Sequence, residues 1–275
     1  MLKKLLIILL AVCAVNGYVW AADIQWFGGA HDRDWFNADN WNSNLIPPGP
    51  VPAGIDKAKL NYVWANAGPI ISAPGAIANE IFISEDRDLG TIGEQSLTVA
   101  TGGTLSTNGQ VILGYNGPDS RNGLPANEGR LIMQGGTATM GSHLFVGFSG
   151  IGHLEVNAGT LNIFNGMFAP GWNGGSGTIE LNGGLLHTEQ WWGSLPQSFD
   201  FEFDITEGEW IQNHYWVNEI QALVNAGLIT GYGGAGTVVI EWDPVLEQTH
   251  VTAVIPEPVS IALFGLGALL LRKRF

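Results

Sequence analysis

The chain has 275 residues, of which 45% are hydrophobic, 13% are charged and 39 are glycine. This glycine share is about twice the usual value of roughly 7%, and the hydrophobic share is too high for a disordered linker. The formal net charge is −14, with 25 acidic residues against 11 lysines and arginines, so the surface repels nucleic acid phosphates and anionic lipid. Composition argues against a nucleic-acid-binding protein and predicts an acidic, folded one.

Residues 1–21 have the layout of a secretory signal peptide. Two lysines precede an apolar stretch, and a small-residue site ending at Ala21 follows it. We expect cleavage after Ala21, because cleavage one residue later would place the bulky Trp20 three residues before the cut. The single cysteine, Cys13, lies within this segment, so we expect the exported protein to contain no disulfide.

We assign residues 22–78 to an N-terminal cap. Aromatic and turn-forming residues cluster here as Trp26-Phe27-Gly28-Gly29, Trp35, Asn40-Trp41, Pro47-Pro48 and Asp56-Lys57-Ala58. This succession resembles the opening of secreted proteins with autotransporter-type repeats. The resemblance implies that the segment begins a coil and covers its end.

Residues 79–197 repeat an alternating apolar motif that ends in glycine. The copies begin at Leu97, Leu131, Leu154 and Ile179, and their anchoring glycines are Gly103, Gly136, Gly159 and Gly184. The first copy needs a one-residue slip to align, which predicts a bulge. A second short strand ending in glycine follows each of the first three anchors. The repeat resembles the autotransporter-passenger type.

A period of about 23–25 residues with short strands in each unit is typical of a β-solenoid, whose stacked coils share one core. We therefore predict the all-β class and a single-chain parallel β-solenoid (β-helix) with end caps. The competing architecture is a β-sandwich, but the even spacing from each glycine to the next strand favours the solenoid. Asn157 and Asn182 occupy matching positions, with Gln134 as a third, and we expect their amides to stack.

Residues 198–254 break the repeat, and we assign them to a small C-terminal cap containing one helix. Phe201, Phe203 and Ile205 alternate with acids, as in a strand with one wet face. Apolar residues recur at helical spacing over 217–226, and Gly227 ends that helix. Two closing strands are predicted over 237–242 and 250–254. Such a cap would cover the unpaired backbone at the end of a coil.

Residues 255–275 contain the most specific motif of the chain. A Pro-Glu-Pro element, an apolar run over 259–271 and a basic cluster follow one another, and the residues of the motif on either side of the run are Pro256, Glu257, Pro258, Arg272, Lys273 and Arg274. As a helix the run is about 20 Å long, short of the roughly 30 Å hydrocarbon core of a membrane.

This arrangement resembles the PEP-CTERM sorting signal of Gram-negative bacteria. The resemblance implies that the export machinery delivers the protein and that the C-terminal helix holds it transiently in the membrane. An exosortase-type protease then recognises the Pro-Glu-Pro element and removes the tail. The alternative is an ordinary C-terminal membrane anchor.

Glu155 and Glu180 are the candidate carboxylate pair inside the repeat for hydrolysis of a glycosidic bond. They occupy equivalent places in adjacent units, so their backbones should lie about 5 Å apart. Nothing near them in the sequence indicates a cleft or a perturbing charge. We therefore interpret them as a solvated ladder, and we expect no catalytic residue.

No metal or cofactor is expected either. The segment 31–34 is rich in ionisable residues but fails the calcium-loop pattern, so an exposed turn is predicted there. His143, His153 and His187 lie at non-equivalent places in their repeats, which does not suit a zinc site.

Three tryptophans, Trp172, Trp191 and Trp192, are candidates for stacking on sugar rings from outer loops. The alternative is that they belong to the core or to an end cap, where each buries a large apolar area.

Together these features predict a secreted or surface-associated, non-catalytic structural protein of the cell envelope or the extracellular matrix. The alternative is a glycan-binding or polysaccharide-processing domain on the same scaffold. Extracellular polysaccharide is then the expected partner, and nucleic acid is not.

Overall fold

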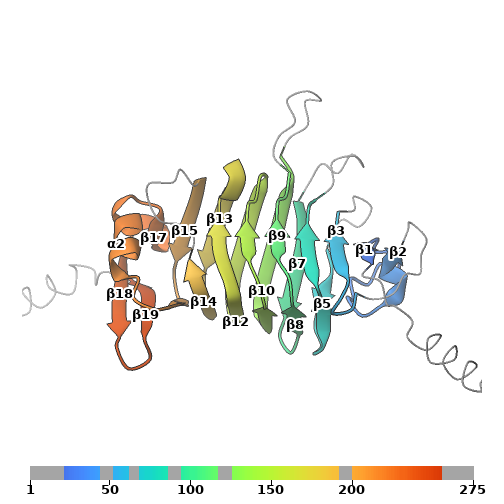
Figure 1. Cartoon of the computed structure of the whole chain (residues 1–275), viewed down its shortest axis with the longest axis horizontal. Coiled ribbons are helices and arrows are strands. Elements are labelled where there is room, and N and C mark those ends of the chain that lie inside the picture. Colours follow the sequence, from blue (N-terminus) through green and yellow to red (C-terminus); the bar gives the residue numbers. More distant parts are fainter. Residues whose placement is uncertain are drawn as a thin grey trace, which may run out of the picture.

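The computed structural model describes residues 22–43, 52–61, 68–85, 94–116, 126–191 and 200–255. Within these ranges, strands stacked side by side along one axis form an elongated molecule (Figure 1). The predicted all-β class and parallel β-solenoid are confirmed, with about six turns. The β-sandwich is excluded, because parallel strand pairs join successive coils.

Equivalent strands of successive coils pair in parallel and form three faces. Face 1 contains β4 (Ile70–Ile71), β7 (Glu94–Ala100), the first part of β10 (Glu128–Met140), the first part of β12 (Ile151–Pro170), β13 (Ser176–Leu181), β15 (Asp200–Ile205) and β17 (Ile229–Gly231). Face 2 contains β5 (Ala76–Ala78), β8 (Thr104–Thr107), the later parts of β10 and β12, β14 (Leu185–Trp191) and β16 (Glu209–Asn213). Face 3 contains β1 (Asp23–Trp26), β3 (Lys57–Leu60), β6 (Glu80–Ile83), β9 (Val111–Leu113), β11 (Leu144–Val146) and the end of β12.

The sequence repeat coincides with the register of the coils. Leu131 pairs with Leu154, and Leu154 pairs with Ile179. The slip expected in the first copy is confirmed, since the pairing of β7 with β10 shifts between Gln134 and Gly135. The alternation of apolar residues therefore specified which side chains lie above one another.

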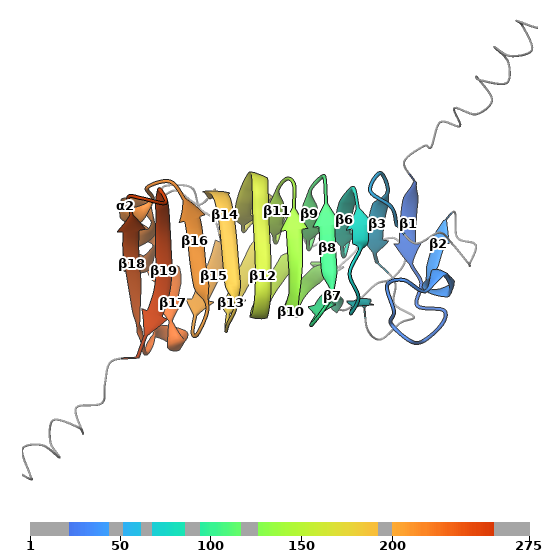
Figure 2. The same cartoon turned by 90° about the horizontal axis from the view of Figure 1, so that it is seen from below.

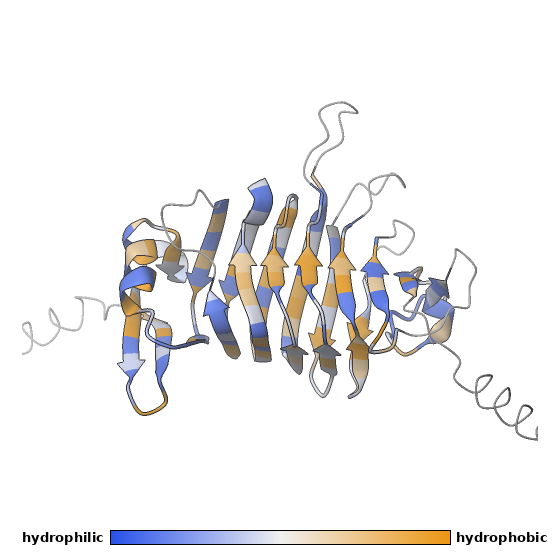
Figure 3. Ribbon diagram, in the orientation of Figure 1, coloured by the Kyte–Doolittle hydropathy of each residue, from blue (hydrophilic) through white to orange (hydrophobic). Residues whose placement is uncertain are grey.

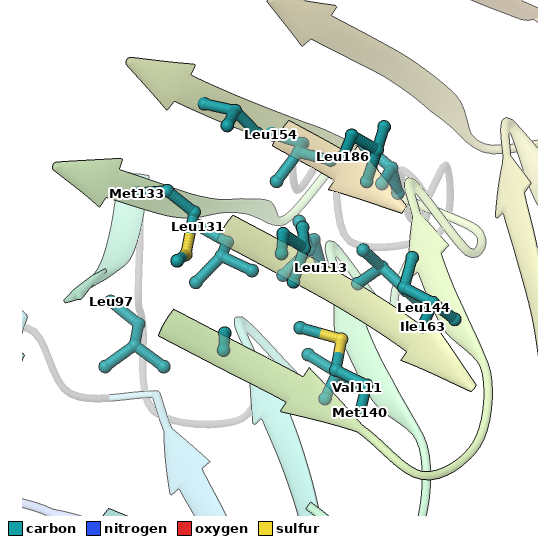
Figure 4. Close-up of a cluster of buried hydrophobic side chains, with 14 of the residues drawn as sticks. Leu97, Val111, Leu113, Leu131, Met133, Met140, Leu144, Leu154, Ile163 and Leu186 are labelled. Atoms are coloured by element: carbon teal, nitrogen blue, oxygen red, sulfur yellow. The ribbon is translucent and has the colours of Figure 1, made fainter. Parts of the chain in front are cut away.

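Inward side chains from the three faces fill one continuous core. Leu131, Met133 and Leu154 of face 1 are fully buried, and Val111 and Leu144 of face 3 lie in the same core (Figure 4). Apolar segments occupy corresponding places on successive strands (Figure 3). Each such side chain contributes about 1.5–3 kcal/mol on burial. The single cysteine lies in residues 1–21, so the coils are stabilised by this stacked core and not by disulfides.

The corner after face 3 requires a left-handed backbone. Gly114, Gly147 and Gly171 hold equivalent places there, with φ of 67°, 79° and 63°. A Cβ on Gly147 would lie 2.0 Å from the backbone oxygen of Ser176 in the next coil. Glycine at this corner thus serves both the turn and the close approach of the coils.

The amide stack at the corner between faces 1 and 2 is confirmed in part. Asn182 Nδ2 donates to Asn157 Oδ1 over 2.9 Å, and the hydroxyl of Thr206 donates to Asn182 Oδ1 over 3.2 Å in the following coil. Gln134 pairs instead with Ala158 across the register shift of β10 and β12. The bulge therefore takes the predicted third amide out of line.

The coil stack begins before residue 79, where the sequence placed its first unit. β1 pairs in parallel with β3, and β3 with β6, so face 3 starts at Asp23. The 3-10 helix η1 (Ala38–Asn40) then leads into β2 (Trp41–Ser43), which pairs antiparallel with β1.

Three indoles close this end of the core. Trp26, Trp35 and Trp41 are at most 1% exposed, and their rings meet edge to face at 5.1 and 4.7 Å. The indole nitrogen of Trp41 donates to the backbone oxygen of Trp35 over 2.7 Å. The opening segment thus contributes coil strands as well as an end cover.

The stack also continues past residue 197, the expected end of the repeats. β15 pairs in parallel with β13, and β16 with β14, because alternation alone suffices for stacking without the glycine motif. The predicted helix is confirmed as α2 (Val217–Asn225). After β17, the 3-10 helix η3 (Tyr232–Gly234) leads into the two predicted closing strands, β18 (Thr237–Asp243) and β19 (Gln248–Val254). They form an antiparallel hairpin on β16, with β18 outermost (Figure 2).

Candidate functional site

Face 1 carries charged side chains in two neighbouring columns. One outward column runs through Ile132, Glu155, Glu180 and Asp204, which are in register in consecutive coils. The neighbouring column runs through Arg130, His153, Thr178 and Glu202. We call these two columns from Arg130 to Asp204 the charged groove.

Two adjoining shallow pockets lie along the charged groove. The first, of about 170 Å³, is lined by Arg130, His153, Leu154 and Glu155 and ends at Thr178 and Glu180. The second, of about 340 Å³, starts at the same two residues. It is also lined by Glu202, Asp204, Gly227 and Thr230. The groove therefore extends from the middle coils to the C-terminal end of α2.

The basic groups of the charged groove lie at one end, where each contacts an acid, and the columns continue from there with Glu180, Glu202 and Asp204. Arg130 forms an ion pair with Glu155 of the next coil, and His153 Nε2 lies 2.8 Å from Glu128 Oε1. Towards the other end, Asp204 accepts hydrogen bonds from the Thr230 hydroxyl over 2.7 Å and from the Gly233 backbone over 2.8 Å. Asp204 thus ties the turn after β17 to the coil.

The sequence interpretation of Glu155 and Glu180 needs correction. Their register in adjacent strands is confirmed, but Arg130 supplies a charge beside Glu155 and both acids line a pocket. Arg130 was missed because its in-register neighbour is His153, and the ion pair runs diagonally to the next outward position. The separation of Arg130 and Glu155, 25 residues, is one repeat period and could have indicated that the two side chains are close.

The prediction of an outer-loop position for Trp191 is wrong. Trp191 ends β14 and is 3% exposed. Its ring lies 5.2 Å from Phe168 and 5.0 Å from Trp210, so it belongs to the core. The cause is the register shift between Ile163 and Met167, after which the inward positions change phase. Trp192 lies outside the described residues.

Trp172 is half-buried and lies on the outer side of face 3. Its ring centre is 6.0 Å from Phe145, an outward residue of β11. Tyr115, Phe148 and Trp172 each follow one of the corner glycines, and we call these three rings the aromatic row. They pack against a second apolar cluster outside the coil, formed by Phe82, Ile112, Phe145 and Ala169.

Two rings of the aromatic row stack on each other, which covers one face of each. Tyr115 and Phe148 are stacked, with centres 5.2 Å apart and an interplanar angle of 5°. A sugar ring needs a free aromatic face, and those two rings cover each other. Of the three predicted stacking residues, Trp172 alone is described as partly accessible.

The N-terminal acidic segment forms an ordered turn, as expected. The Asp32 carboxylate accepts hydrogen bonds from the backbone of Asp34 over 3.0 Å and from the amides of Asn37 and Asn40 over 2.6 Å each. These bonds lower the pKa of Asp32, and the bond from the Asp34 backbone has the largest effect. The carboxylate therefore has a structural role in this turn.

Within the described residues, no three His, Cys, Asp or Glu side chains gather as a metal site. The histidines have separate partners: Met167 N donates to His143 Nδ1 over 2.8 Å, and His187 Nε2 lies 2.9 Å from Asn213 Oδ1. Among the helices in these ranges, none has the length and apolar character needed to span a bilayer.

The predicted cleavage site at Ala21 and the Pro-Glu-Pro motif with its basic cluster lie outside the described residues. Comparisons with protein-family models, with curated proteins and with solved structures found no match.

Proposed function

We propose that the chain is a non-catalytic structural protein of the cell exterior. Its stiff acidic solenoid would act as a spacer between the surfaces or molecules that bind its ends or faces. The observation that carries this proposal is the single core, which runs from Ile24 in β1 to Val251 in β19. A continuous core resists bending, because each coil packs on both neighbours.

The terminal segments supply the route in this proposal. Residues 1–21 direct export, and residues 255–275 act as a PEP-CTERM-like sorting tail that an exosortase-type protease removes. The surface charge suits an extracellular protein, because no lysine or arginine occurs between Arg130 and Arg272. A strongly acidic surface keeps such a protein soluble and prevents non-specific association.

Mass spectrometry of the exported protein tests the route. The full chain is produced in a Gram-negative host with and without an exosortase-type protease. We expect a mature form beginning at Ala22 and lacking the apolar run 259–271 when the protease is present. The triple change of Pro256, Glu257 and Pro258 to alanine should retain the run. A surface-exposed wild-type protein that keeps residues 259–271 would contradict the sorting role.

Glycan binding is the second candidate function, favoured by the partial exposure of Trp172 in the aromatic row. Retention on immobilised polysaccharides tests it, with Trp172→Ala as the variant and Trp35→Phe, at the buried N-terminal end, as the control. Loss of retention in Trp172→Ala alone would support binding. Cleavage of any polysaccharide that is abolished by Glu180→Gln would instead overturn the non-catalytic assignment.

A further inference from the structure

The outermost strand of the C-terminal hairpin has an unused edge. Among the residues that the structure describes, β18 forms a strand ladder with β19 alone, and a backbone bond from Gly236 N to Gly231 O ties the residue before it to β17. It is seven residues long, with the sequence Thr-Val-Val-Ile-Glu-Trp-Asp, and contains neither proline nor lysine. Natural sheets usually protect such an edge with proline or with charges, lysine above all, because its free N–H and C=O groups accept another strand. The charges that β18 carries are Glu241 and Asp243.

Exposed apolar side chains concentrate at the same end. Seven large hydrophobic residues are exposed in the described ranges. Five of them lie in residues 215–255, after β16: Tyr215, Val245, Leu246, Val254 and Ile255. Val245, at the hairpin tip, is 87% exposed. The opposite end of the coil is closed by Trp26, Trp35 and Trp41, which are at most 1% exposed.

We propose that β18 binds β18 of a second copy of this chain, antiparallel and centred on Ile240, so that two solenoids join end to end. Pairing of a strand with itself about a two-fold axis uses the same surface on both copies and closes as a dimer. Face 2 would then continue without a break from β16 of one protomer through both hairpins to β16 of its partner (Figure 2).

The number of paired residues and the charges together select this register over its neighbours. A two-fold axis perpendicular to the sheet requires one residue to face its own copy, and only Ile240 at the centre allows all seven residues to pair. Glu241 then faces Val239 of the other copy, and Asp243 faces Thr237. Centring on Glu241 places two glutamates opposite each other, and centring on Trp242 places Glu241 opposite Asp243. Like charges directly opposite one another destabilise a sheet pair.

The side-chain faces of β18 agree with this arrangement. Val238 and Ile240 pack against the core, so their face of the strand is already covered. Val239 and Glu241 alternate with them on the outer side, where Val239 lies opposite Thr252 of β19 and Glu241 opposite His250. A charge introduced at position 239 would therefore remain in solvent in the monomer and meet Glu241 only in the dimer.

Sedimentation of the full chain in mild detergent tests the proposal, with the same apolar tail in every protein compared. We expect the wild type to be dimeric. Val239→Glu should raise the dimer dissociation constant roughly tenfold, because it creates two like-charge pairs. Val239→Lys should dimerise at least as tightly as the wild type, since lysine would face Glu241. The double variant Val239→Glu with Glu241→Lys should restore the dimer.

Circular dichroism of each variant separates loss of the dimer from loss of the fold. A wild-type protein that stays monomeric at every concentration would overturn the proposal. Slow hydrogen exchange of the β18 amides in such a monomer would show that the chain's own C-terminal residues occupy the edge instead. Equal weakening by Val239→Glu and Val239→Lys would also overturn it, because a contact without this register has no reason to distinguish the two charges.

Discussion

At the scale of single residues, the coil depends on a few positions where only glycine fits. The corner glycines combine a positive φ with backbone of the next coil at the place a Cβ would occupy. Gly147 and Gly174 allow the two effects to be separated. Both have a φ of 79°, but a Cβ on Gly147 would lie 2.0 Å from Ser176 O, whereas one on Gly174 meets nothing within 4 Å.

We therefore expect Gly174→Ala to lower the free energy of unfolding by about 1–2 kcal/mol, which is the cost of the left-handed conformation alone. Gly147→Ala should cost several kcal/mol more, because two coils must separate to admit the methyl group. Urea unfolding followed by circular dichroism measures both. Similar midpoints for the two variants would show that the coils adjust freely and would contradict the close stacking described above.

Residue patterns also show what the sequence was able to predict. Leu131, Leu154 and Ile179 were placed correctly, because strict alternation beside a repeating glycine fixes both the face and the register. Trp191 was misplaced because a register shift changes the phase of alternation without a sequence marker. The charged groove was missed because the Arg130–Glu155 pair joins diagonal positions of neighbouring coils.

At the scale of elements, the Asp32 carboxylate joins the turn before η1 through three hydrogen bonds. The bonds that the Asp34 backbone, Asn37 and Asn40 donate to Asp32 lower its pKa below the ordinary 3.8. The folded turn thus binds a proton more weakly than the unfolded chain does. Its stabilising effect is complete above the unfolded pKa and is lost as the pH falls through the lower, folded pKa.

We expect the amide of Asp34 to exchange slowly near neutral pH and to lose protection as the solution is acidified below about pH 4. Asp32→Asn should exchange faster throughout and should lack this dependence on pH. Hydrogen exchange followed by NMR measures both effects, with Asp39→Asn in the same turn as the control. If Asp32→Asn keeps the acid-dependent step, another group controls the turn.

At the scale of the whole molecule, the coils are interchangeable units of one stack. Ile151 and Ser176 are in register, so residues 151–175 form one complete coil. Removing that coil should bring the next one down onto β10 with the inward residues still inward. In a repeat architecture each unit contacts its neighbours alone, and stability changes by roughly one unit and its interface.

Deletion of residues 151–175 should therefore give a folded protein shorter by about 4.8 Å, the spacing of one strand. Deletion of Glu155 alone, inside the paired part of β12, shifts that strand by one position and turns apolar side chains outward, so we expect it to aggregate. Circular dichroism and small-angle scattering distinguish the two. A soluble, folded product from the shorter deletion would show that register is not set by alternation.

The indole groups give the molecule an optical asymmetry along its length. Trp26, Trp35 and Trp41 are packed at one end of the core, while Trp191 and Trp210 are in contact towards the other. Once the tryptophans outside these two groups (Trp20, Trp64, Trp172, Trp192, Trp216 and Trp242) are replaced by phenylalanine, the remaining fluorescence comes from the two groups, and substituting either group leaves a signal specific to the opposite end. Fraying from each terminus of the stack then becomes separately visible, without any attached dye.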